Sequence, residues 1–184
     1  MRQFVQNRGQ QFTALAAVRA LAGLIGRFPT LRYLVVGQGP HLASLQERAR
    51  MLGVADRVHF LTDVADDELA TAYRFAEIYL GLSRLHETDV EGFGISFLEA
   101  AAAERPVVAG SSGVSPDAVD HGRTRLLVIQ RDPVEATAAG EMLLTEREHA
   151  AAMGAAGRER VLDEFTWATV AARFQSIAAE LGRG

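Results

Sequence analysis

The chain is expected to fold as an α/β domain in which a doubly wound parallel sheet carries helices on both faces. Short apolar runs alternate with longer segments whose apolar residues recur at helical spacing, as in consecutive β-α-β units. The short runs are continuously apolar, as strands must be when both faces of a parallel sheet are covered. With 184 residues the chain can bury the core of one such domain, and we expect residues 1–184 to form a single unit.

The first elements illustrate the pattern. Residues 12–25 repeat apolar side chains at helical spacing, and residues 31–36 then form an apolar run that Gly37 ends. Pro40 suits the first turn of a helix over about residues 41–52. The chain thus passes from helix to strand to helix within its first third.

The remaining elements follow the same alternation. A short strand is expected at residues 57–61, and a helix with an acidic first turn at residues 66–75. Further strands are expected at 78–82, 106–109 and 126–129, and further helices at 95–103, 133–144, 146–162 and 167–181. Before the first helix only residues 2–5 could form a strand. We therefore predict a Rossmann-like sheet whose first strand is truncated, as in part of a larger protein.

Composition excludes several functions. The chain has no cysteine, so it forms neither disulfides nor thiolate metal sites, and all 19 basic residues are arginine, which removes lysine chemistry. A net charge of −4 argues against nucleic-acid binding, which needs a basic face. The most apolar stretch, residues 14–25, contains Arg19 and is too short to cross a bilayer. The N-terminus has no signal-peptide pattern, so we expect a cytoplasmic protein.

The segment of greatest chemical interest is DVEGFGISFLEA, at residues 89–100. It follows an expected strand and opens an expected helix, which is where open α/β sheets bind their ligands. Gly92 and Gly94 let the backbone approach a ligand closely, and the helix N-terminus offers N–H groups to an anion such as a diphosphate. Glu91 and Glu99 bracket this turn, and each carboxylate could accept the two hydroxyl hydrogen bonds that hold a sugar or a ribose.

Both glutamates also have a simpler interpretation. Glu91 could be a solvated loop charge, and Glu99 an acidic residue that complements the helix dipole, since helix starts favour acids. His86, Glu87 and Asp89 lie nearby in the sequence, but their spacing matches no common set of metal ligands. We therefore expect no metal site.

Several stretches form an ordered set of motifs. They are VVGQGP at 35–40, LGV and VHF within 52–60, RPVVA and SG within 105–113, EGFGISFLE at 91–99, and MGAAGR and FTW within 153–167. This set resembles the retaining glycosyltransferases of family 4, the glycosyl transferases group 1, and the run at 91–99 is similar to that family's signature of two glutamates with seven residues between them. The run DVEGFGI is similar to the branch of mannosyltransferases that acts on phosphatidylinositol. The resemblance implies the donor-binding half of a GT-B fold, without its N-terminal acceptor-binding domain.

The resemblance assigns roles to both glutamates and to the turn between them. Glu91 should be the catalytic residue, beside the transferred sugar, where it helps to stabilise the charge that develops as the glycosidic bond breaks. Glu99 should bind the ribose hydroxyls of the nucleotide. The donor-binding residues of the turn should be Gly92, Phe93, Gly94 and Ile95, and the backbone of the last three should hold the sugar's other hydroxyls and the distal phosphate.

The family's contacts to the diphosphate and the base fall on three further positions. The family places a lysine and an arginine on the diphosphate. Arg8 stands at the lysine position, where it keeps the charge and can clamp a phosphate bidentately. Gln3 stands at the arginine position with Arg2 one residue away, so Arg2 is the second candidate cation. Val64, after the strand expected at 57–61, should contact the base through its backbone.

These inferences predict the donor-binding domain of a retaining, metal-independent enzyme that transfers a hexose from a nucleotide diphosphate sugar without a cofactor. Its expected partners are the donor and the N-terminal acceptor-binding domain, in the same protein or as a separate chain, through which the protein could associate with a membrane surface. Alone, the chain should bind donor without useful turnover. The alternative is a non-catalytic subunit, or a degenerate nucleotide-binding module, that docks on a separate acceptor-domain partner. The last expected helix would make that contact, with Trp167 as a core or docking anchor.

Overall fold

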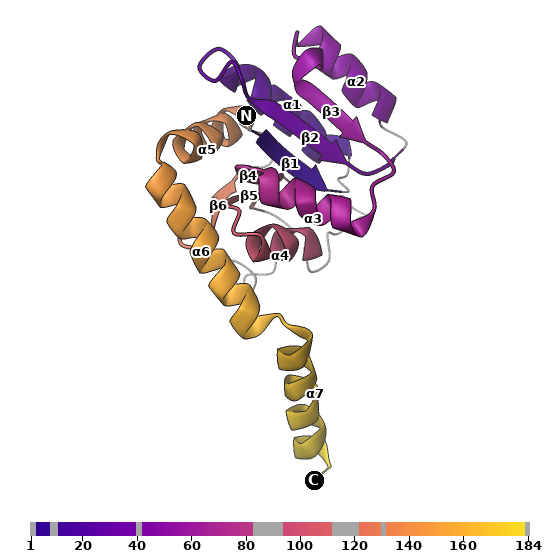
Figure 1. Ribbon diagram of the computed structural model, residues 1–184, viewed down its shortest axis with the longest axis vertical. Helices are drawn as coiled ribbons and strands as arrows, with labels where there is room; N and C mark the ends of the chain where they lie inside the picture. The colour runs from indigo at the N-terminus through magenta and orange to yellow at the C-terminus, as the bar shows by residue number, and fades with distance from the viewer. Residues whose placement is uncertain are drawn as a thin grey trace.

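The computed structural model describes residues 3–7, 11–39, 42–82, 94–111, 122–129 and 132–182. Within them one sheet is formed by β1 (Gln3–Asn7), β2 (Arg32–Val36), β3 (Val58–Leu61), β4 (Ile78–Gly81), β5 (Val107–Gly110) and β6 (Arg125–Val128). The strand order is β3-β2-β1-β4-β5-β6, and every neighbouring pair is parallel. Parallel neighbours need crossover connections, which place helices over both faces of the sheet (Figure 1).

Seven α-helices belong to the described residues, and those before α7 contribute residues to the apolar clusters on the two faces of the sheet. They are α1 (Gln11–Leu24), α2 (Leu42–Met51), α3 (Asp66–Phe75), α4 (Ile95–Ala102), α5 (Pro133–Thr145), α6 (Arg147–Glu164) and α7 (Trp167–Leu181), with a 3₁₀ turn, η1 (Ala55–Arg57), before β3. Residues of α1, α2, α5 and α6 join one apolar cluster, and residues of α3 and α4 join another. α1 packs beside α5, and α4 packs against α6.

Side chains of β2, β4 and β5 alternate between the two clusters. In β2, Tyr33 and Val35 belong to the cluster under α1 and α5, whereas Leu34 and Val36 belong to the cluster under α3 and α4. All four side chains are buried, and for this reason the strand is continuously apolar in sequence. The predicted Rossmann-like, doubly wound α/β fold is confirmed.

The strand order reverses between β1 and β4, and this reversal positions the candidate site. β1 pairs with β2 on one side and with β4 on the other, and the chain leaves these two central strands in opposite directions along the sheet. Ligands of open α/β sheets bind in the crevice outside the carboxyl ends of the strands at such a point. β1 ends at Asn7 and β4 at Gly81, and the chain segments that follow them contain most of the predicted site residues.

The observed boundaries of the predicted elements differ from the expected ones by at most two residues. β1, for which only residues 2–5 were expected, comprises Gln3–Asn7 and pairs along its whole length with β2. Trp167 is 88% exposed, so of its two expected roles the core anchor is wrong for this chain, and the docking anchor stays a prediction. α7 continues from the end of α6 and projects away from the sheet (Figure 1). None of the helices in the described part of the chain is long and apolar enough to span a bilayer.

Candidate functional site

α4 begins at the crevice with a glycine that its position requires. Gly94, the N-cap of α4, has φ 73° and ψ 49°, a left-handed conformation that residues with a side chain rarely adopt. A Cβ atom on Gly94 would lie 2.6 Å from Cδ2 of Phe97, which is closer than real Cβ contacts. Backbone geometry and the Phe97 ring therefore both demand glycine where the predicted donor-binding turn enters α4.

Phe97 also covers the end of β4. A Cβ on Gly81 would overlap the Phe97 ring, and the centroid of that ring lies 5.7 Å from the Tyr79 centroid in an edge-to-face contact. Gly81 and Gly94 are thus packed against the same ring, although the segment 82–93 separates them in sequence. The carboxyl end of β4 and the start of α4 therefore meet at the Phe97 ring.

A buried cation supports Phe97. The guanidinium carbon of Arg125 lies 5.3 Å from the Phe97 ring centroid, within range of a cation–π interaction. Burial lowers the pKa of Arg125 to about 10, with a smaller effect from the like charge of Arg160 in α6. Arg125 is only 6% exposed, so it braces Phe97 from inside the domain and is not a candidate phosphate ligand.

Glu99, the predicted ribose ligand, is held by a tyrosine from the neighbouring helix. The Tyr73 hydroxyl, on α3, donates a hydrogen bond to Oε2 of Glu99 at 2.9 Å. Tyr73 is 2% exposed, whereas Glu99 is half-buried on the second turn of α4. A hydrogen bond to a carboxylate is stronger than one between neutral groups. Glu99 is therefore an oriented acceptor, not a freely solvated charge.

Val64 lies on the same side of the sheet as Glu99. It follows β3 at the carboxyl ends of the strands and immediately precedes Ala65, the N-cap of α3. Its half-buried side chain packs against the apolar cluster that contains Tyr73 and Phe97. The structure therefore brings Val64, Glu99 and the start of α4 to one apolar cluster on one face of the sheet.

The first N–H groups of α4 have no capping side chain within the described residues. The N-cap is a glycine, and no side-chain cap hydrogen bond is formed there. Other helices begin differently: Asp132 accepts from N–H of Val134 at 2.8 Å on α5, and Glu68 accepts from N–H of Ala65 at 3.0 Å on α3. The start of α4 therefore carries no acid of its own that would repel an anion from its N–H groups.

The remaining predicted site residues lie outside the described residues. They are Arg2, Arg8, Glu91, Gly92 and Phe93. Their placement, and with it the distance between Glu91 and Glu99, stays a prediction. Ile95, the first residue of α4, is described and 66% exposed at the crevice.

The described residues give no independent indication of a metal ion. They contain no group of three or more histidine, aspartate or glutamate side chains arranged to hold one. His86, Glu87 and Asp89, considered above, belong to the part of the chain that the structure leaves undescribed. The expectation of a metal-independent site is thus neither supported nor opposed.

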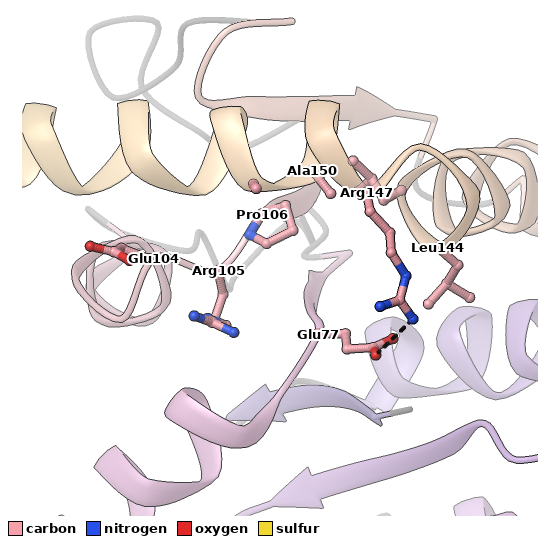
Figure 2. Close-up of a pocket in the computed structure, with 9 residues that line it drawn as sticks. Glu77, Glu104, Arg105, Pro106, Leu144, Arg147 and Ala150 are labelled. Carbon is pink, nitrogen blue, oxygen red and sulfur yellow. Dashed lines mark ion pairs between the residues drawn. The ribbon is translucent and has the colours of Figure 1, made fainter. Parts of the chain in front are cut away.

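A cavity of about 260 Å³ lies beside the amino ends of β4 and β5 (Figure 2). Its lining includes Glu77 and Pro106, which directly precede β4 and β5, and Arg147, whose Nη2 lies 4.0 Å from Oε1 of Glu77. Glu77 and Pro106 thus lie at the amino ends of β4 and β5, and Arg147 is the first residue of α6. The cavity is therefore separated from the crevice at Gly81 by the length of the strands and takes no part in the candidate site.

Two motifs of the sequence hold α4 in place. The Arg105 guanidinium donates to the carbonyl oxygens of Ala103, at 2.7 Å, and Ala76, at 3.0 Å, which are the C-caps of α4 and α3. Arg158 of α6 donates to the carbonyl oxygen of Ala102. These bonds satisfy carbonyl groups that a helix end leaves without an intrahelical partner. The RPVVA and MGAAGR motifs are thus structural supports of the candidate site.

Sequence reasoning missed Tyr73. It lies in helical register with Leu69, Ala72 and Ala76, and this apolar spacing predicts only a core position. The partner of its hydroxyl, Glu99, is 26 residues away on another helix. Only the tertiary structure brings these two side chains together.

The chain matches known proteins over nearly its whole length. Residues 6–160 match the family described as glycosyl transferases group 1. Over 173 residues the chain is 40% identical to the GDP-mannose-dependent alpha-(1-6)-phosphatidylinositol monomannoside mannosyltransferase of Mycobacterium tuberculosis (strain CDC 1551 / Oshkosh). That alignment covers 93% of this chain and 44% of the relative, so the chain spans less than half of the relative's length.

Solved structures share the fold. A glycosyltransferase from Rickettsia africae ESF-5 has a TM-score of 0.84 at 17% identity, over 98% of this chain and 48% of that one. The C-terminal domain of a glycosyl transferase group 1 family protein (LpcC) from Francisella tularensis has a TM-score of 0.76 at 18% identity, over 90% of this chain and 87% of that one. The match over residues 6–160, which is more than half of the chain, establishes that the chain belongs to the glycosyl transferases group 1 family.

Proposed function

We propose that this chain is the donor-binding domain of a retaining glycosyltransferase that transfers a hexose from a nucleotide diphosphate sugar. The observation that supports the proposal is the carboxylate of Glu99, which the Tyr73 hydroxyl holds at 2.9 Å on the helix that starts at the strand-order reversal. A carboxylate offers about four acceptor sites, so the bond from Tyr73 leaves acceptors for the two hydroxyls of a ribose.

The diphosphate would lie at the start of α4. Its negative charge is favoured by the helix dipole and by backbone N–H groups, and the Gly94 N-cap lets a ligand approach the backbone. In this proposal Arg8, which follows β1 in sequence, makes the second contact to the diphosphate, and Arg2 makes a third. Arginine suits this role because its planar guanidinium can bind a phosphate through two parallel hydrogen bonds.

Glu91 completes the proposed chemistry. When the bond between the sugar's anomeric carbon and the diphosphate oxygen breaks, the electron pair goes to the diphosphate and positive charge develops on the sugar. A carboxylate at Glu91 would stabilise that charge, while the diphosphate-binding groups stabilise the leaving group. Gly92, Phe93 and Ile95 belong to the same proposed contact surface.

GDP-mannose is the donor that the relatives favour. The mannosyltransferase of Mycobacterium tuberculosis is named for its dependence on GDP-mannose, and this chain is 40% identical to it. We propose that the backbone at Val64 contacts the guanine and that the branch acting on phosphatidylinositol is the nearest in function. The acceptor would be bound by the part of the protein that lies outside the matched 44% of that relative.

Nucleotide titration tests the proposal. Isothermal titration of the purified chain with GDP, UDP and ADP should detect binding of at least one of them at millimolar concentration or below. Glu99→Ala should weaken that binding by ~1–3 kcal/mol, because it removes a hydrogen-bonding partner of the nucleotide. Glu47→Ala is the matched control, since Glu47 is 59% exposed on α2 and pairs with Arg50 of its own helix. No binding of any of the three nucleotides would end the proposal.

α7 favours a second candidate function, a subunit without turnover of its own that docks on a separate acceptor-domain chain. None of the residues of α7 is buried, and Trp167, Phe174, Ile177 and Leu181 are all more than half exposed. Their spacing places them along one side of the helix, as a docking face requires. The chain should then transfer mannose only when a purified acceptor domain, such as the N-terminal part of the Mycobacterium tuberculosis relative, is added. Transfer by the chain alone would contradict this candidate.

A further inference from the structure

Tyr73 joins the two helices that cover one face of the sheet. Its hydroxyl reaches from α3 to Oε2 of Glu99 on α4 at 2.9 Å. The Tyr73 ring lies 5.8 Å, centroid to centroid, from the Tyr79 ring, and Tyr79 in turn meets Phe97 edge to face. A row of aromatic rings therefore fixes Tyr73 relative to the strand and to the start of α4.

The two partners of this hydrogen bond differ in freedom. Tyr73 is 2% exposed, and packing fixes the position of its hydroxyl oxygen because a tyrosine has only two side-chain torsions to restrain. Glu99 is half-buried, and a glutamate side chain has more torsions to order. Tyr73 is thus the fixed partner, and its hydroxyl sets the direction of the Glu99 carboxylate.

We infer that Tyr73 is a positioning residue for ribose recognition: its hydroxyl orients the Glu99 carboxylate toward the 2′- and 3′-hydroxyls of the donor nucleotide. This inference rests on the proposed function and goes beyond it, because it assigns part of the nucleotide affinity to a residue that touches no ligand. The bond to Oε2 fixes the plane of the carboxylate, and the remaining acceptor sites then point in a constant direction. Without the Tyr73 hydroxyl, nucleotide binding would have to order the Glu99 side chain, and the conformational entropy lost in doing so would weaken the affinity.

Tyr73→Phe is the direct test, because it removes one oxygen atom and keeps the ring. Titrations are made with whichever of GDP, UDP and ADP the chain binds, and with the 2′,3′-dideoxy form of the same nucleotide. We expect Tyr73→Phe to weaken binding of the ribonucleotide about tenfold, and to leave binding of the dideoxy form unchanged. An equal loss with both nucleotides, or no loss with either, would overturn the positioning role.

Two further variants separate positioning from stability. Tyr33→Phe removes another fully buried phenol hydroxyl, from the cluster on the other face of the sheet, and should lower the melting temperature without changing either affinity. The double variant Tyr73→Phe, Glu99→Ala should bind the ribonucleotide no more weakly than Glu99→Ala alone, because alanine leaves no acceptor for the Tyr73 hydroxyl and Tyr73 acts through Glu99. A further loss in the double variant would show that Tyr73 acts by another route.

The outcomes also distinguish this inference from the function on which it rests. If the unmodified chain binds no nucleotide, both are wrong. If it binds a nucleotide and Glu99→Ala weakens that binding while Tyr73→Phe does not, the donor site stands and only the positioning role fails.

Discussion

Gly154 of α6 lies directly against the carbonyl group of Glu104, at the end of the helix that carries Glu99. A Cβ atom on Gly154 would overlap the Glu104 carbonyl oxygen and would lie 2.8 Å from its carbon. Glu104 itself has φ 60°, a left-handed conformation that suits the residue after a helix end. α6 can therefore approach α4 this closely only because residue 154 has no side chain.

Gly154→Ala should destabilise the domain by about 1–3 kcal/mol, because its new methyl group would clash with backbone atoms of Glu104, which cannot move away as a flexible side chain could. Urea unfolding followed by circular dichroism measures the change. Gly26→Ala is the control, since no atom lies within 4 Å of the Cβ that it would add. Equal stability of the two variants would show that α6 shifts on α4 without cost.

Gly94→Ala and Gly53→Ala form a second matched pair. Both glycines have a left-handed backbone, with φ 73° and 70°, but only Gly94 faces a ring where its Cβ would be. Both variants should lose about 1 kcal/mol from the backbone conformation, and Gly94→Ala should lose more because Phe97 must move. Gly94→Ala alone should also weaken nucleotide binding in a titration. A loss of affinity in Gly53→Ala of the same size would argue that the start of α4 has no special role.

Alkaline pH should destabilise the chain through Tyr33. Burial raises the pKa of Tyr33 well above 10.0, and the nearby Tyr79 raises it further. The folded state therefore keeps the phenol proton that the unfolded chain loses above pH ~10. The stability contributed by Tyr33 is fully present below that pH and falls by about 1.4 kcal/mol per pH unit as the pH rises further, until the folded pKa is reached.

Urea unfolding of the unmodified chain and of Tyr33→Phe between pH 9 and 11 measures the contribution of Tyr33 to the pH dependence of the free energy of unfolding. The stability of Tyr33→Phe should fall less steeply over that range, and the difference between the two slopes isolates Tyr33. Parallel slopes would mean that Tyr33 ionises in the folded state as easily as in the unfolded one.

α7 should contribute little to the stability of the isolated chain. Phe174 is 71% exposed, so Phe174→Ser should change the free energy of unfolding by less than about 0.5 kcal/mol. Phe4→Ala, at a fully buried position, should cost about 3–5 kcal/mol by comparison. A large loss of stability in Phe174→Ser would mean that α7 packs on the domain in solution.

The fold could be predicted from the sequence because each strand is buried on both faces. Residues 78–82 contain no polar side chain except the hydroxyl of Tyr79, and a glycine ends the strand, so its type and length followed from local pattern. The candidate site could be predicted only in part. Glu99 lay in a family signature, but the arrangement that holds it depends on Tyr73, which local sequence marks only as a core residue. The same limit applies to Arg105, whose two carbonyl partners lie at the ends of different helices.

A crystal structure of this chain soaked with GDP tests the central claim most directly. We expect the nucleotide to lie outside the carboxyl ends of β1 and β4, with both ribose hydroxyls within hydrogen-bonding distance of the Glu99 carboxylate and Tyr73 still bonded to Oε2. A nucleotide bound in the cavity beside Glu77 and Arg147, or bound with its ribose away from Glu99, would contradict it.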